Sequence, residues 1–119
     1  MPKSDPLLQM AERLAELERR QANIVRKVKV KENKDGKVIV EDGTGFVSGE
    51  RPQASMSAGG WKIDAPADVG SQGLLFSPDG DPANSVFLPC LPDDDHEAAS
   101  TKTNTFKLIS PEGKTITIN

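Results

Sequence analysis

The 119-residue sequence has no tyrosine and contains only one cysteine, one histidine and one tryptophan. A single cysteine cannot form an intrachain disulfide, so nothing in the sequence requires an oxidising compartment. No apolar run reaches the roughly 18 residues that a transmembrane helix needs. The first five residues also lack the apolar core of a secretion signal. These absences predict a soluble protein made in a cytoplasm.

Residue types that carry catalysis or hold metals are also scarce. His96 lies in an acidic segment, and Cys90 has no histidine near it in sequence, so together they cannot supply a zinc site. The acidic run at residues 93–95 lacks the calcium-loop pattern with its terminal glutamate. The Gly-x-Gly at Gly43 and Gly45 lacks the strand-to-helix context of a dinucleotide site. The sequence therefore predicts no enzyme, no cofactor and no metal.

Charge is unevenly distributed along the chain. The formal net charge is −3, which argues against a dedicated nucleic-acid binder. Basic residues crowd the first third, whereas none occurs between Lys62 and Lys102, where acidic residues accumulate. This separation of basic and acidic residues is typical of solvated faces, and it is also compatible with an ordered assembly in which neighbouring chains make charged contacts.

Residues 5–21 are predicted to form a helix, with Asp5 as its N-cap and Pro6 at its first position. Arg13 and Glu18 take heptad positions g and e, from which they can pair between chains. The a and d positions of the same heptads carry apolar side chains, namely Leu7, Met10, Leu14 and Leu17. An amphipathic helix packed on its own domain is an equally open interpretation. Because so short a helix is marginal alone in water, it needs a partner.

From residue 23 to residue 92 the pattern changes to short strands separated by Gly-, Pro- and Asp-rich turns. Alternation around Val28 and Val30 places the valines on one face and the neighbouring lysines on the other. The expected strands are 24–30, 38–40, 53–57, 72–77 and 84–88, with loops at 41–45 and 48–52. Five short strands fit a small OB-fold barrel.

An acidic linker at residues 93–105 precedes two more alternating strands, at 106–109 and 115–118. Their apolar residues are Phe106, Leu108, Ile116 and Ile118. In a single chain this hairpin would leave an apolar face and open edges, which is an aggregation hazard. Three copies wound about a common axis would bury the face and pair the edges. The sequence therefore predicts a homotrimer whose last strands begin an intertwined β-prism without metal.

A rival interpretation is an OB-fold module that binds single-stranded nucleic acid or an oligosaccharide. A basic strand face would supply phosphate contacts through Lys27, Lys29 and Lys31. Binding of single strands also relies on exposed aromatic rings for base stacking. No aromatic residue interleaves with these lysines. The ones present are expected in the core or in turns, namely Phe46, Trp61, Phe76 and Phe87. This interpretation ranks second, and no specific nucleic-acid partner is expected.

The segment from residue 61 to residue 91 resembles the signature of phage baseplate assembly protein V, the central spike of contractile tails. In that family a Trp- and Pro-bearing segment leads to a Val-Gly turn, an apolar strand, a Ser-Pro-Gly-Gly-Asp-like turn and a strand ending in Leu-Pro. The matching residues here are Trp61 to Pro66, Val69-Gly70, Leu74-Leu75-Phe76, Ser77 to Asp81 and Val86 to Pro89. The helix, the first strand and the acidic linker occur in matching order, so the similarity spans nearly the whole chain.

The resemblance implies a mainly β protein with four parts. These are an N-terminal helix for hub or trimer contact (1–22), an OB-fold collar (23–92), an acidic linker (93–105) and the start of a trimeric β-helix (106–119). It implies a structural role as a trimer that caps the tail tube and nucleates baseplate assembly. The implied partners are a hub protein beneath the tube and the baseplate wedge proteins. The implied location is the virion baseplate, after synthesis in a host bacterium, and related injection particles use similar parts.

Two features depart from the family pattern. Gly73 stands where a branched apolar residue is usual, which predicts a bulge in that strand. The sequence ends at Asn119, where the needle would begin, and it lacks the His-x-His metal-binding tip. We therefore expect the needle either to have been removed by truncation or to be supplied by a separate tip protein.

Overall fold

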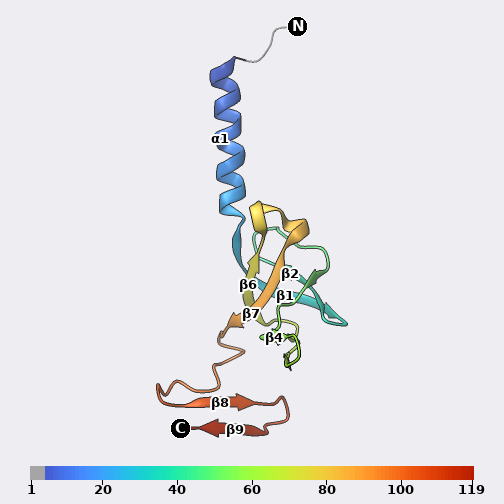
Figure 1. The fold of residues 1–119 in the computed structure, drawn as a ribbon, viewed down its shortest axis with the longest axis vertical. Coiled ribbons are helices and arrows are strands. Elements are labelled where there is room, and N and C mark those ends of the chain that lie inside the picture. The colour runs from blue at the N-terminus through green and yellow to red at the C-terminus, as the bar shows by residue number, and fades with distance from the viewer. Residues whose placement is uncertain (1–4) are drawn as a thin grey trace.

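The computed structural model describes residues 5–119, which form an elongated, mainly β protein with one N-terminal helix (Figure 1). Its principal extents are 69 × 32 × 32 Å. In chain order the elements are α1 (Pro6–Ala22), β1 (Val25–Lys34), β2 (Lys37–Glu41), β3 (Arg51–Pro52), β4 (Ser57–Ala58), β5 (Lys62–Ile63), β6 (Gln72–Phe76), the 3-10 turns η1 (Pro78–Gly80) and η2 (Pro82–Asn84), β7 (Val86–Leu91), β8 (Phe106–Ile109) and β9 (Thr115–Ile118).

The predicted helix and its cap are confirmed. The Asp5 carboxylate accepts a hydrogen bond of 2.9 Å from the Leu7 N–H, and Pro6 occupies the first helical position. No residue of α1 is buried, and the helix projects away from the sheet (Figure 1). The alternative in which the helix packs along its own domain is therefore wrong for the single chain.

Five strands form one curled, half-barrel sheet in the order β3-β2-β1-β6-β7. All four ladders within the sheet are antiparallel. The two edge strands also approach each other. Gln53, just after β3, forms a parallel bridge with Phe87 of β7, and the Ala54 N–H donates to the Phe87 carbonyl at 2.8 Å. The curl thus brings both edges together at one point.

The core lies inside this curl. Val28 and Val30 are each 2% exposed, which confirms the alternation predicted for β1. The other buried apolar residues are Val38, Val40, Ala67, Leu75 and Phe87. Phe46 packs against this cluster from the β2–β3 loop. The core is small and mostly aliphatic, so the sheet has little apolar material to stabilise it alone.

The prediction for residues 48–57 is wrong in two places. Arg51 and Pro52 were expected in a loop, yet they form β3, in which Arg51 pairs with Val38. The strand expected at 53–57 is absent, because that segment turns away toward the small β4–β5 hairpin. The pairing of β3 with β2 depends on the curl of the sheet and not on a local alternation of apolar residues.

The bulge predicted at Gly73 is confirmed. The β6–β7 register shifts between Gln72 and Leu74, and β7 continues to Leu91 instead of ending at residue 88 as expected. A Cβ atom at Gly73 would lie 2.3 Å from the Leu88 carbonyl oxygen and 2.7 Å from the Phe87 ring. Only glycine fits at this close approach of two strands.

The C-terminal hairpin is also confirmed. Among the residues that the structure describes, strands β8 and β9 pair only with each other, and every residue in them is exposed. They lie beyond the barrel at the end of the molecule opposite α1 (Figure 1). Within residues 5–119, no helix has both the length and the apolar character needed to cross a membrane.

Candidate assembly surfaces

The stripe on α1 is exposed along its whole length. Its four predicted interface residues, Leu7, Met10, Leu14 and Leu17, are between 58% and 74% exposed. Glu16 forms ion pairs with Arg19 and Arg20 of the same helix. Large apolar side chains left in water on a helix, with charges on its other faces, are typical of a helix that packs against another molecule.

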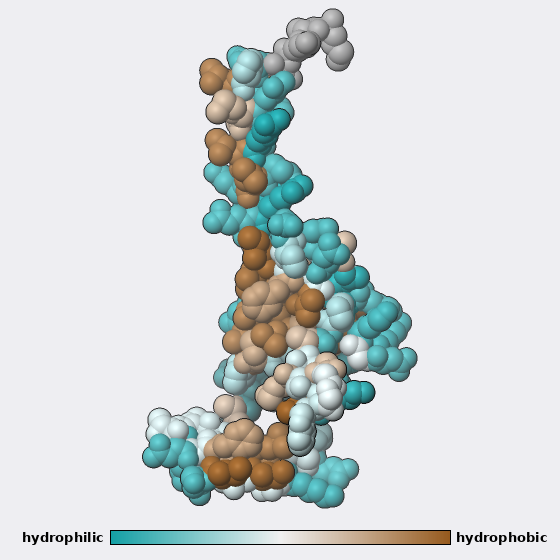
Figure 2. All heavy atoms as spheres, viewed as in Figure 1, coloured by the Kyte–Doolittle hydropathy of each residue, from teal (hydrophilic) through white to brown (hydrophobic). Residues whose placement is uncertain are grey.

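The C-terminal hairpin presents a second apolar face. In the β8–β9 register Phe106 lies opposite Ile118, and Leu108 lies opposite Ile116, so all four side chains share one face. They are between 56% and 60% exposed. Figure 2 shows this face as an apolar patch at the end of the molecule. An isolated two-stranded hairpin is at best marginally stable in water, so this face also calls for a partner.

The direction of α1 is fixed by its contact with the turn η1. Gly80 is buried with φ +71°, and a Cβ atom there would lie 2.3 Å from the Arg20 carbonyl oxygen. On the other side of the junction, the Ser77 N–H donates to the Ile24 carbonyl at 2.7 Å, which ties the start of β1 to the end of β6. The helix therefore continues into the sheet at a defined angle.

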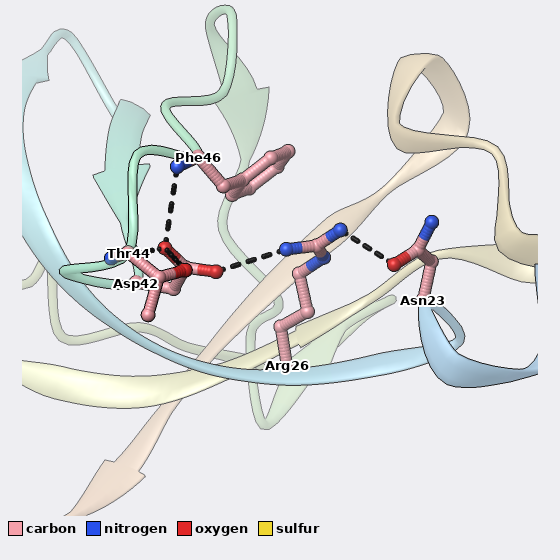
Figure 3. A network of polar contacts seen from close by, with 5 residues as sticks. All are labelled: Asn23, Arg26, Asp42, Thr44 and Phe46. Carbon is pink, nitrogen blue, oxygen red and sulfur yellow. Dashed lines mark hydrogen bonds and ion pairs between the residues drawn. The ribbon is translucent and has the colours of Figure 1, made fainter. Parts of the chain in front are cut away.

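A polar network centred on Arg26 joins the end of α1 to the loop after β2 (Figure 3). The Arg26 guanidinium donates to Asp42 at 2.9 Å and to the Asn23 side chain. It also stacks on the Phe46 ring, 4.1 Å from the ring centroid. The pKa of Asp42 is lowered, mainly by the hydrogen bonds that its carboxylate accepts from the Thr44 N–H and hydroxyl. Partial burial raises the pKa by less, and the Phe46 N–H and the charge of Arg26 lower it a little further. Sequence reasoning missed this network, for which the Asp42-x-Thr44 spacing is a local signal.

His96 and Asp93 hold the start of the acidic linker against the barrel. The His96 N–H donates to the Asp93 carboxylate at 2.8 Å, and the His96 Nδ1 lies 3.2 Å from the same oxygen. Lys29 of β1 lies 3.8 Å from the other Asp93 oxygen. Partial burial by itself raises the pKa of Asp93. The hydrogen bonds from His96 and Asp95 have the larger combined effect, so the pKa of Asp93 lies below its ordinary value. His96 is half-buried in this turn.

The aromatic residues only partly follow the prediction of core or turn positions. Phe87 is buried, and Trp61 lies in the turn of the β4–β5 hairpin but is 85% exposed. Phe76 is neither in the core nor in a turn. It points outward from β6 because Leu75 takes the inward position next to it.

The basic face carries both signs of charge. A shallow hollow of about 430 Å³ is lined by Lys27, Lys29, Glu41 and Asp42, among others. Within the described residues, no group of three or more His, Cys, Asp or Glu side chains is placed to hold a metal ion. The two apolar faces at the ends of the molecule therefore remain the strongest candidate functional surfaces.

Comparison with protein-family models and with curated proteins returned no match.

Proposed function

We propose that this chain is a structural, non-enzymatic component of the central spike of a contractile phage tail or a related injection particle. In this proposal three copies cap the end of the tail tube and nucleate baseplate assembly. The observation that carries it is the pair of exposed apolar faces, one on α1 and one on the β8–β9 hairpin, at opposite ends of an elongated chain.

The curled sheet supports an OB-type collar between these faces. Five strands in the order β3-β2-β1-β6-β7, with the edges meeting at Gln53 and Phe87, fit a partly open five-stranded barrel. We propose that β8 and β9 of the three chains then intertwine as the first turns of a β-prism, without metal.

The apolar faces are large enough to offset the cost of association. Full burial of a Leu, Ile, Phe or Met side chain contributes roughly 1.5–3 kcal/mol. The eight interface residues are 56–74% exposed in the single chain. Burying that remaining area would contribute on the order of 10 kcal/mol per chain. This is of the same order as the roughly 4–15 kcal/mol that association costs.

The proposed mechanism is mechanical. The trimer is assembled beforehand, contacts the hub protein beneath the tube and the baseplate wedge proteins, and moves forward when the sheath contracts. Its location would then be the baseplate of the virion. Electron microscopy of contractile particles, labelled with an antibody to this chain, tests the proposal. Label at the tail tip is expected, and label confined to the sheath, the capsid or free protein would contradict it.

A second candidate is the OB-fold module that binds single-stranded nucleic acid or an oligosaccharide. One observation favours it, because Trp61 is 85% exposed and offers a ring for stacking. Against it stands the mixed charge around Lys27 and Lys29. A tight complex with single-stranded nucleic acid that survives high salt would place this candidate first.

A further inference from the structure

The outer face of the sheet carries a third apolar surface, which the sequence did not indicate. Val25 of β1 pairs with Phe76 of β6, and Phe76 in turn pairs with Val86 of β7. One step along the strands, Leu74 pairs with Leu88 on the same side. Directly paired side chains lie within contact distance. These five residues are therefore one patch, hereafter the wall patch.

The wall patch faces away from the core. The neighbouring positions Val28, Leu75 and Phe87 point inward and are at most 2% exposed, so the patch residues point outward. Val25, Phe76 and Leu88 remain 45%, 40% and 36% exposed. An antiparallel sheet with one face on the core normally carries polar residues on its other face. On this outer face the apolar patch is bordered by Lys27, which pairs with Leu74, and an apolar patch with a polar border is typical of an interface.

The stripe on α1 and the start of β1 meet at a hollow that is also lined by Arg20, Gln21 and Asp79. Leu17, the last stripe residue, lines the same hollow of about 290 Å³ as Ile24, which immediately precedes Val25. Ile24 is 41% exposed. Figure 2 shows apolar surface on the helix, across the barrel and on the C-terminal hairpin in a single view. Apolar residues are thus exposed at both ends and in the middle of a 69 Å long molecule.

We infer that the wall patch packs against the neighbouring copies of this chain in the proposed trimer, so that the interface between chains runs from α1 through the curled sheet to β8 and β9. The inference rests on the proposed trimer and deepens it. A partner that covers the helix, the wall and the hairpin together must be equally long and apolar along one side. A parallel copy of this chain meets both conditions, and rotation about one axis brings all three surfaces into contact at once.

The first test compares Phe76→Asp with Lys37→Asp in the full chain. Both positions are exposed on strands of the same sheet, but Lys37 lies on β2, outside the wall patch. Sedimentation over a concentration series should show the trimer of Phe76→Asp dissociating at concentrations at least about tenfold higher than wild type. The concentration at which the Lys37→Asp trimer dissociates should differ from that of wild type by less than about twofold. If the two variants dissociate at the same concentration, the inference is wrong.

A second test does not depend on a disruptive substitution. In a Cys90→Ser background, single cysteines are introduced as Phe76→Cys, Leu14→Cys and Lys37→Cys, and each protein is treated with a short bis-maleimide. Covalent dimers and trimers are expected from Phe76→Cys and Leu14→Cys but not from Lys37→Cys. If Leu14→Cys cross-links and Phe76→Cys does not, the inference fails while the proposed trimer stands. If neither cross-links and wild type sediments as a monomer, the proposed trimer fails as well.

Discussion

The contact between Gly80 and the end of α1 gives a sharp test of how the helix is held. Gly80 has φ +71°, and an alanine Cβ there would lie 2.3–2.7 Å from the Arg20 carbonyl oxygen, Cα and carbonyl carbon. The left-handed backbone alone costs an alanine roughly 1–2 kcal/mol. Forcing a methyl group against a packed neighbour adds about 1–3 kcal/mol, unless the helix moves away.

Gly36→Ala is the matched control for Gly80→Ala. Gly36 has a similar φ of +83° in the β1–β2 turn, but a Cβ atom there meets nothing within 4 Å. Urea unfolding followed by circular dichroism measures the stability, and light scattering measures the oligomer. We expect Gly36→Ala to lose only the roughly 1–2 kcal/mol of stability that the left-handed backbone costs an alanine, and to keep its oligomeric state. Gly80→Ala should either lose about 2–5 kcal/mol of stability or dissociate, because a displaced helix no longer aligns its stripe. If the two variants behave alike in both assays, the contact does not fix the helix.

Three further predictions concern the barrel and its surface. Gly73→Ala places a methyl group 2.3 Å from the Leu88 carbonyl oxygen, so it should destabilise the barrel by at least about 2 kcal/mol in urea unfolding; an unchanged midpoint would contradict the described bulge. The pKa of Asp42 is lowered from its ordinary value of 3.8, so its contribution to stability is present above that pH and is lost as the pH falls through the folded pKa. Asp42→Asn should therefore flatten the acid side of the stability profile, and a profile identical to wild type would refute this role. Binding of single-stranded DNA should be weak and should fall steeply with salt, which fluorescence anisotropy at two salt concentrations checks.

Local signals in the sequence predicted the elements that local physics determines. The cap at Asp5 and the proline after it fix the start of the helix, and both depend on residues within one turn. The inward positions of Val28 and Val30 follow from strict alternation with lysines. The exposed stripe on α1 was predictable in the same way, because heptad spacing is a property of one segment.

Features that depend on distant pairing were not predictable. The apolar run 74–76 has no alternation, so nothing in it tells that Leu75 points inward and Phe76 outward. Strand β3 exists because Arg51 meets Val38 across the curled sheet. The wall patch exists only because three strands pair in one particular register. Each of these requires the folded sheet, as does the contact between Gly80 and a helix that ends about 60 residues earlier in the chain.

The mass of the purified 119-residue chain in solution tests the central claim most directly. Multi-angle light scattering at micromolar concentration is expected to give about three times the chain mass of 12.8 kDa. A stable, folded monomer at that concentration, with no trimer in the assembled particle either, would contradict the account.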